Sequence, residues 1–96
     1  HYAEAKALLR KVTPVARRIL GKSDRLTLKM RKIYARTLYE DDGATLDDLR
    51  EAVATLADVE RIARRVLGGA HPLVDGIEIH LRLSRAALNA RETAGA

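Results

Sequence analysis

The chain has 96 residues, of which 47% are hydrophobic, 32% are charged and 3% are aromatic, and it contains no Cys. This length suits one small domain or a piece of a longer one, and the balance of apolar and charged residues is that of a folded protein. The absence of Cys excludes disulfide frameworks, Cys-based zinc sites and thiol catalysis. Ala, Leu and Arg dominate, so we expect an all-α fold in one region over residues 1–96.

The charge balance is mildly basic, with 18 Lys and Arg against 13 Asp and Glu and a net charge of +5. Such a balance permits attraction to acidic proteins, nucleic acid or an anionic membrane, but acids and bases are interspersed along the chain, so none of these is required. No apolar run approaches the roughly 18 residues of a membrane span, and no signal-peptide pattern is visible. We expect a cytoplasmic protein with no membrane span.

Four helical segments are expected, because apolar residues recur at steps of three and four with no sustained alternation of period two. They span residues 3–20, 24–40, 45–67 and 72–91. The links between them are short, so neighbouring helices should pack antiparallel.

The first segment carries apolar residues from Leu8 to Leu20, and Gly21 follows as a C-terminal stop. Pro14 lies inside this segment and removes a backbone donor. It either kinks the helix or restarts it with Thr13 as N-cap. We expect one kinked helix.

The second segment has Ser23 or Asp24 as its N-cap. Leu26, Met30 and Ile33 recur at steps of four and three, so they are expected on the buried face. Four basic residues also lie at steps of three and four, and we expect them on the opposite face. They are Arg25, Lys29, Lys32 and Arg36.

The third segment begins at Thr45, and an acid three residues later, Asp48, is typical of a capping box. Gly68 ends this segment, and Pro72 is a favourable first residue for the fourth. Four acids cluster near the start of the third segment: Asp41, Asp42, Asp47 and Asp48. A calcium loop needs alternating ligands and a Glu at its twelfth position. That pattern is absent, so we expect caps and turn residues.

The strongest signal is an internal repeat. Residues 15–21, Val-Ala-Arg-Arg-Ile-Leu-Gly, return 47 residues later as residues 62–68, Ile-Ala-Arg-Arg-Val-Leu-Gly. A single helical hairpin cannot bury both of its helices, and stacked hairpins bury a continuous core. We therefore predict antiparallel hairpins stacked as an α-solenoid, a fragment of a longer array, with the two copies in equivalent environments.

Each copy of the repeat ends in Leu-Gly. We expect Leu20 and Leu67 to fill the seam between hairpins. We expect Gly21 and Gly68 to take the left-handed turn that a Cβ disfavours.

The helix at 3–20 ends in Arg-Arg-Ile-Leu-Gly, and the helix at 45–67 ends in Arg-Arg-Val-Leu-Gly and leads to His71-Pro72. These joints resemble tetratricopeptide repeats of the kinesin light chain type, which are linked by Leu-Gly and Asp-His-Pro. Tyr34-Ala35 resembles the Leu-Ala pair of the family's next helix, and Gly43 lies where the family turns. The resemblance covers nearly the whole chain. It implies a non-catalytic scaffold that binds a protein or peptide segment on a concave helical surface.

The sequence departs from this family in two ways. The offset of 47 residues exceeds the roughly 34 residues of a tetratricopeptide unit, and the excess falls in residues 41–50. The Asn pair that the family often carries is replaced by Lys32-Ile33 and, in the second copy, by Ile79-His80. The resemblance therefore implies the scaffold and not the family's peptide-clamping Asn.

In the family, the helices that correspond to 24–40 and 72–91 line the groove, so we expect the ligand to contact their basic side chains. These candidate contacts are Lys29, Lys32, Arg36, Arg82 and Arg85. Arg donates two parallel hydrogen bonds to carboxylate or phosphate, so the expected partner is an acidic or phosphorylated peptide. A run of charges is also typical of a solvated face, and that interpretation stays open.

Two other functions stay open. One is a basic helical module that binds nucleic acid or anionic lipid. It is the weaker hypothesis, because Arg82 and Arg85 lie beside Asp75 and Glu78, whereas a phosphate backbone favours a uniformly basic track. The other is a structural unit that spaces neighbouring repeats.

Catalysis is not expected, because no Gly-rich phosphate loop, nucleophile elbow or acid/base pair is visible. Small helical mutases of the chorismate type bind a dicarboxylate with Arg and Lys, but that reading leaves the repeat unexplained. His71 and His80 lie nine residues apart with no third ligand at helical spacing. We therefore expect no metal, no cofactor and no small-molecule substrate.

Overall fold

The computed structural model describes residues 2–95 and contains four helices and no strand in that range. The helices are α1 (Tyr2–Leu20), α2 (Arg25–Tyr39), α3 (Leu46–Leu67) and α4 (Pro72–Gly95). The predicted all-α class is confirmed. The main difference from the predicted bounds is at the end of α4, which continues from the expected residue 91 to Gly95.

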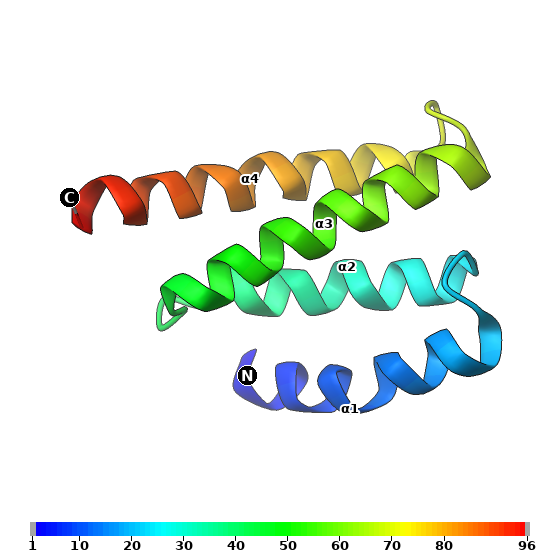
Figure 1. The fold of residues 1–96 in the computed structure, drawn as a ribbon, viewed down its shortest axis with the longest axis horizontal. Helices are drawn as coiled ribbons and strands as arrows, with labels where there is room; N and C mark the ends of the chain where they lie inside the picture. Colours follow the sequence, from blue (N-terminus) through cyan, green and yellow to red (C-terminus); the bar gives the residue numbers. More distant parts are fainter. Residues whose placement is uncertain (1, 96) are drawn as a thin grey trace.

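The helices form an open row in chain order (Figure 1). The backbone of α1 packs on α2, α2 on α3 and α3 on α4, and α2 also touches α4. Within residues 2–95 the α1 backbone does not approach that of α3 or α4. A closed four-helix bundle would bring the first and last helices together, so the row is open, and its extents are 40 × 29 × 17 Å.

Pro14 lies inside one continuous helix, so the alternative of a restart at Thr13 is wrong. Figure 1 shows α1 bending near its middle. Proline removes one backbone hydrogen bond and crowds the preceding turn, which accounts for such a bend.

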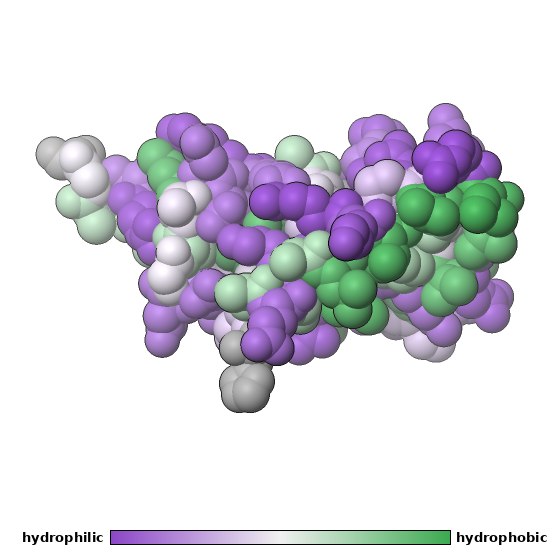
Figure 2. Space-filling model, turned by 90° about the horizontal axis from the view of Figure 1, so that it is seen from below, coloured by the Kyte–Doolittle hydropathy of each residue, from purple (hydrophilic) through white to green (hydrophobic). Residues whose placement is uncertain are grey.

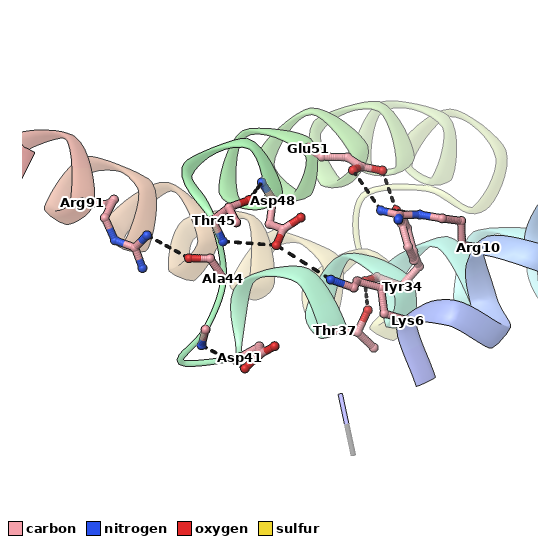
Figure 3. Close-up of polar contacts among 11 residues, drawn as sticks. Lys6, Arg10, Tyr34, Thr37, Asp41, Ala44, Thr45, Asp48, Glu51 and Arg91 are labelled. Atoms are coloured by element: carbon pink, nitrogen blue, oxygen red, sulfur yellow. Dashed lines mark hydrogen bonds and ion pairs between the residues drawn. The ribbon is translucent and has the colours of Figure 1, made fainter. Parts of the chain in front are cut away.

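The predicted caps are present at the starts of α2 and α3. The Asp24 side chain accepts a hydrogen bond from Leu26 N at 2.8 Å. Thr45 and Asp48 form a reciprocal capping box with bonds of 3.0 and 3.1 Å (Figure 3). Asp41 accepts from the backbone N–H of Gly43 at 3.0 Å. These acids therefore serve helix starts and a turn, as expected.

The two repeated glycines end α1 and α3 in the same way. Gly21 has φ 95° and Gly68 has φ 88°. Each donates its N–H to the carbonyl of the Arg four residues earlier, Arg17 or Arg64, at 3.0 Å. The predicted role of both glycines is confirmed, because a side chain at positive φ is strained.

The residues after each glycine are also equivalent. Asp24 and His71, three residues further on and 47 residues apart, each begin the next helix. Leu26 N donates to the Asp24 carboxylate at 2.8 Å, and Leu73 N donates to His71 Nδ1 at 3.0 Å. Different side chains thus perform the same capping role at the two joints.

The equivalence continues along α2 and α4. Thr37 Oγ1 donates to the carbonyl of Tyr34 at 2.6 Å, and Ser84 Oγ donates to that of Leu81 at 2.9 Å. Both hydroxyl residues are buried, and they too are 47 residues apart. The repeat in the structure is therefore much longer than the seven residues that match in sequence.

The apolar core lies where α2, α3 and α4 meet. Its largest fully buried apolar side chains are Leu28, Leu38, Leu56, Val59, Ile77 and Val74. Within Tyr2–Leu20, by contrast, Thr13 alone is buried. The packing of α1 therefore rests mainly on α2, and Lys6 and Arg10 add ion pairs with Asp48 and Glu51 of α3.

Two expectations about apolar residues are wrong. Leu20 is 45% exposed and does not fill a seam, because α1 has a helix packed on one side only; Leu67 does pack against the core. Leu26 and Ile33 are also exposed. The buried arc of α2 instead includes Thr27, whose hydroxyl donates to a carbonyl of α1.

Replacing Gly68 with Ala should destabilise the fold by about 1–3 kcal/mol, because φ 88° with ψ 153° is a region that only glycine adopts freely. An added Cβ meets nothing within 4 Å, so the effect isolates the backbone conformation. Urea unfolding followed by circular dichroism would measure the change. Gly95→Ala, where a Cβ also meets nothing within 4 Å, is the control and should change the unfolding free energy little. Equal effects of the two substitutions would contradict the interpretation.

Candidate functional site

The predicted basic residues of α2 lie beside α4, on a surface that we call the α2/α4 face. It is formed by Lys29, Lys32 and Arg36 of α2 and by Gly76, Ile79, His80 and Leu83 of α4. The two helices are in backbone contact here. Three of the α4 residues lie 47 positions after the α2 cations: Gly76 corresponds to Lys29, Ile79 to Lys32 and Leu83 to Arg36.

Lys32 reaches across to α4. Its Nζ lies 3.0 Å from the position that a Cβ on Gly76 would occupy. A larger residue at position 76 would therefore displace the ammonium group. Glycine in the interior of a helix is unfavourable by about 1 kcal/mol, so its presence here fits the close approach of Lys32.

The α2/α4 face carries positive charge that the acids among the described residues neutralise only at Arg36. Burial lowers the pKa of Lys32, and the neighbouring Arg36 and Lys29 lower it further. Arg36 Nε pairs with Glu40 at 3.1 Å. No acid between residues 2 and 95 pairs with Lys29 or Lys32. Like charges held together and partly shielded from water favour the arrival of an anion.

A tyrosine–histidine pair links α2 to α4 beside these cations. Tyr39 Oη lies 2.5 Å from His80 Nδ1, and the two rings are 6.0 Å apart. Burial lowers the pKa of His80, and Arg36 and Lys32 lower it further. Burial also raises the pKa of Tyr39 to about 12. At neutral pH the Tyr39 hydroxyl therefore keeps its proton and shares a hydrogen bond with a neutral imidazole.

Two exposed apolar side chains complete the face. Ile79 is 47% exposed and Leu83 is 49% exposed, and each is the counterpart of a basic residue on α2. The arrangement therefore places cations on one helix beside apolar surface on the other. Such a surface can accept a carboxylate or phosphate together with a neighbouring apolar side chain.

Arg82 and Arg85, also expected in the groove, lie elsewhere. Glu78 pairs with Arg64 of α3, so this flank of α4 faces α3. Arg82 and Arg85 follow Glu78 at four and seven residues, so they share its flank, whereas Gly76 and His80 face α2. The structure therefore brings together Lys29, Lys32 and Arg36 but not these two residues. Adding the repeat offset of 47 to the numbers of Lys29, Lys32 and Arg36 gives Gly76, Ile79 and Leu83. The repeat could therefore have identified these α4 residues from the sequence.

The described residues contain no cluster of metal ligands and no membrane-spanning helix. Within residues 2–95 no three His, Cys, Asp or Glu side chains come together as metal ligands. His71 caps α4 and His80 bonds Tyr39, so both rings have protein partners. None of the helices in this range combines the length and the apolar character that crossing a membrane requires.

Comparison with family models, with curated proteins and with solved structures finds no match to the chain.

Stability should fall as the pH drops below about 6.5, the ordinary pKa of histidine. The pKa of His80 is lower in the folded than in the unfolded protein, so folding favours the neutral ring. The resulting contribution to the unfolding free energy is fully present above the unfolded-state pKa, and it is lost as the pH falls through the folded-state pKa. Urea unfolding at about pH 7.5 and pH 5.5 would measure the loss. His80→Gln should lose less stability over this range than the wild type, and equal losses would contradict the role of His80.

Proposed function

We propose that the chain is part of a helical-repeat scaffold, an α-solenoid of the tetratricopeptide kind, that binds a protein segment and does no catalysis. The observation that carries the proposal is the recurrence, 47 residues apart, of the glycine joint, the helix cap and the buried hydroxyl. Repeated joints of this kind stack helical hairpins at a regular interval. A cytoplasmic location and the absence of a cofactor belong to the same proposal.

The exposed apolar surface of α1 supports stacking. Leu8, Val15 and Ile19 lie seven and four residues apart on one stripe, and all three are exposed. Figure 2 shows apolar side chains gathered on the underside of the molecule, where α1 lies. A stripe of exposed apolar side chains is unusual on a surface that faces water, and it indicates a place where another helix packs.

The equivalent stripe of α3, Thr55, Ile62 and Val66, is covered in part: Ile62 is buried and Thr55 is half-buried, while Val66 stays 46% exposed. Arg31 of α2 donates to Asp58 of α3 at 2.8 Å, so this flank of α3 faces α2. Ile62, one turn after Asp58, is 5% exposed, whereas its counterpart Val15 is 41% exposed. A helix like α2 from a further hairpin would therefore fit on α1, which is what an array requires.

The proposed ligand is an acidic or phosphorylated peptide bound on the α2/α4 face. Lys29 and Lys32 supply charge without a protein partner among the described residues, and Ile79 and Leu83 supply apolar contact. Nucleic acid or anionic lipid, the alternative, favours a continuous basic track, whereas this face pairs a basic helix with an apolar one. The mixed character therefore favours a peptide.

The test is selection of peptides from a random displayed library on the immobilised protein. We expect the selected sequences to carry Asp or Glu next to an apolar residue. The double variant Lys32→Glu, Arg36→Glu should weaken their binding at least about tenfold, since charge-assisted hydrogen bonds contribute about 1.5–3 kcal/mol each. Fluorescence anisotropy with labelled peptides would measure the affinities.

The matched control is Arg18→Glu, Arg65→Glu, which makes the same charge change at two exposed positions of α1 and α3. It should leave the peptide affinity nearly unchanged. Equal weakening by both double variants would mean that net charge alone attracts the peptides. A steep salt dependence with tight binding of duplex DNA or anionic vesicles would support the alternative instead.

Gly76→Ala tests the face without changing any charge. A Cβ at this position would force the Lys32 ammonium to move, while Ala raises helix propensity. We expect a stabilisation of about 0.5–1 kcal/mol in urea unfolding, together with weaker binding of the selected peptides. Unchanged binding would place the ligand away from Lys32.

A further inference from the structure

A cleft lies on the side of α2 away from the α2/α4 face, where α1, α2 and α3 meet. It has a volume of about 260 Å³, and the residues that matter in its lining are Arg10, Thr13, Arg17, Arg31, Tyr34 and Glu51. Tyr34 and Arg36 are two residues apart on α2 and therefore point to opposite sides of the helix. The cleft thus shares no residue with the α2/α4 face.

Thr13 lines this cleft and carries a buried hydroxyl that has no hydrogen-bond partner among the described residues. Its side chain is 8% exposed, and its Oγ1 is the one buried side-chain N or O atom in residues 2–95 that makes no hydrogen bond. The other buried hydroxyls behave differently, since those of Thr37 and Ser84 donate to backbone carbonyls. An unpaired buried hydroxyl is unfavourable by about 1–3 kcal/mol, so a ligand that paired with Thr13 would gain binding energy.

The guanidinium groups beside the cleft are only partly used. Arg10 donates to Tyr34 Oη at 2.9 and 3.1 Å and lies 3.6 Å from Glu51 (Figure 3). Arg31 donates a hydrogen bond to Asp58 through one nitrogen, Nη1. A guanidinium has five N–H donors, so both retain donors for a ligand.

The charges around the cleft do not balance. The hydrogen bond from Arg31 lowers the pKa of Asp58, and the charges of Arg61, which also pairs with this carboxylate, and Arg17 lower it further. Arg17 itself forms no ion pair with any acid in residues 2–95. With Arg10 and Arg31, four guanidiniums surround two carboxylates, those of Glu51 and Asp58. Two positive charges are therefore left over.

We propose that this cleft binds a phosphate group, with Arg10, Arg17 and Arg31 donating to its oxygens and the Thr13 hydroxyl supplying a further donor. A phosphate monoester carries close to two negative charges at neutral pH, which matches the surplus, and it has three oxygens for donors arriving from different directions. A carboxylate matches less well, because it carries one charge and two oxygens. The bearer is a phosphorylated side chain or free phosphate, and the two sources share this chemistry.

The test is a titration of the ¹⁵N-labelled protein with inorganic phosphate at constant ionic strength, with chloride as the reference salt. We expect saturable shifts of backbone amides around residues 10–17, 31–34 and 51–55. Arg17→Gln should weaken binding about tenfold, the effect of one charge-assisted hydrogen bond. Shifts that grow linearly, or that chloride reproduces, would show that free phosphate does not occupy the cleft and would leave a phosphorylated side chain as the ligand to be tested.

The matched control is Arg18→Gln, which removes the same charge from the next residue of α1, outside the cleft lining. It should leave the phosphate affinity unchanged. An equal loss for both variants would mean that phosphate responds only to net charge and would overturn the site. The Lys32→Glu, Arg36→Glu variant should also bind phosphate normally, so failure of the peptide proposal and failure of this one are distinguishable.

Thr13→Val removes the hydroxyl and keeps the shape of the side chain. It should lower phosphate affinity about fivefold, since one neutral hydrogen bond is lost, while the fold stays as stable or becomes more stable. Unchanged affinity would remove Thr13 from the site.

Comparing inorganic phosphate with O-phosphoserine and a phosphoserine peptide identifies the source of the phosphate group. Tighter binding of the peptide favours a phosphorylated partner, and equal binding favours free phosphate. Failure of all three probes would overturn the proposal.

Discussion

The architecture depends on two glycines that reverse the chain at positive φ. Gly21 and Gly68 end α1 and α3, each bonded to the carbonyl four residues earlier. A side chain disfavours this conformation, so the position of each glycine fixes where the next helix begins. Because Asp24 and His71 then cap α2 and α4 three residues later, the two helices start in the same register relative to their joints. That register makes residues 47 positions apart equivalent.

The central helix α2 links the two surfaces discussed above. One flank contacts α4 through Lys32 and the Tyr39–His80 pair. The other contains Tyr34 and Arg31, which bond to α3 and line the cleft beside α1. A buried charge is tolerated only with a partner, so Asp58 is what allows Arg31 to lie inside. Any ligand on either surface therefore acts on the helix that holds the row together.

The residues of the α2/α4 face were only half predictable from sequence. Steps of three and four placed Lys29, Lys32 and Arg36 on one flank, because helical spacing is local geometry. The same reasoning chose Arg82 and Arg85 on α4 by their charge, although α4 presents its Gly76 flank to α2. Charge does not reveal which flank of a helix meets its neighbour.

By itself the sequence determined the four helices, their caps and their stops, because hydrophobic period, capping boxes and glycines act within a few residues of the chain. It also determined that the joints recur. The tertiary structure alone decided which apolar residues are buried: Leu20, Leu26 and Ile33 are exposed, while Thr13 and Arg31 are inside. Burial depends on whether another helix covers a given flank, and that is set by contacts between residues far apart in the chain.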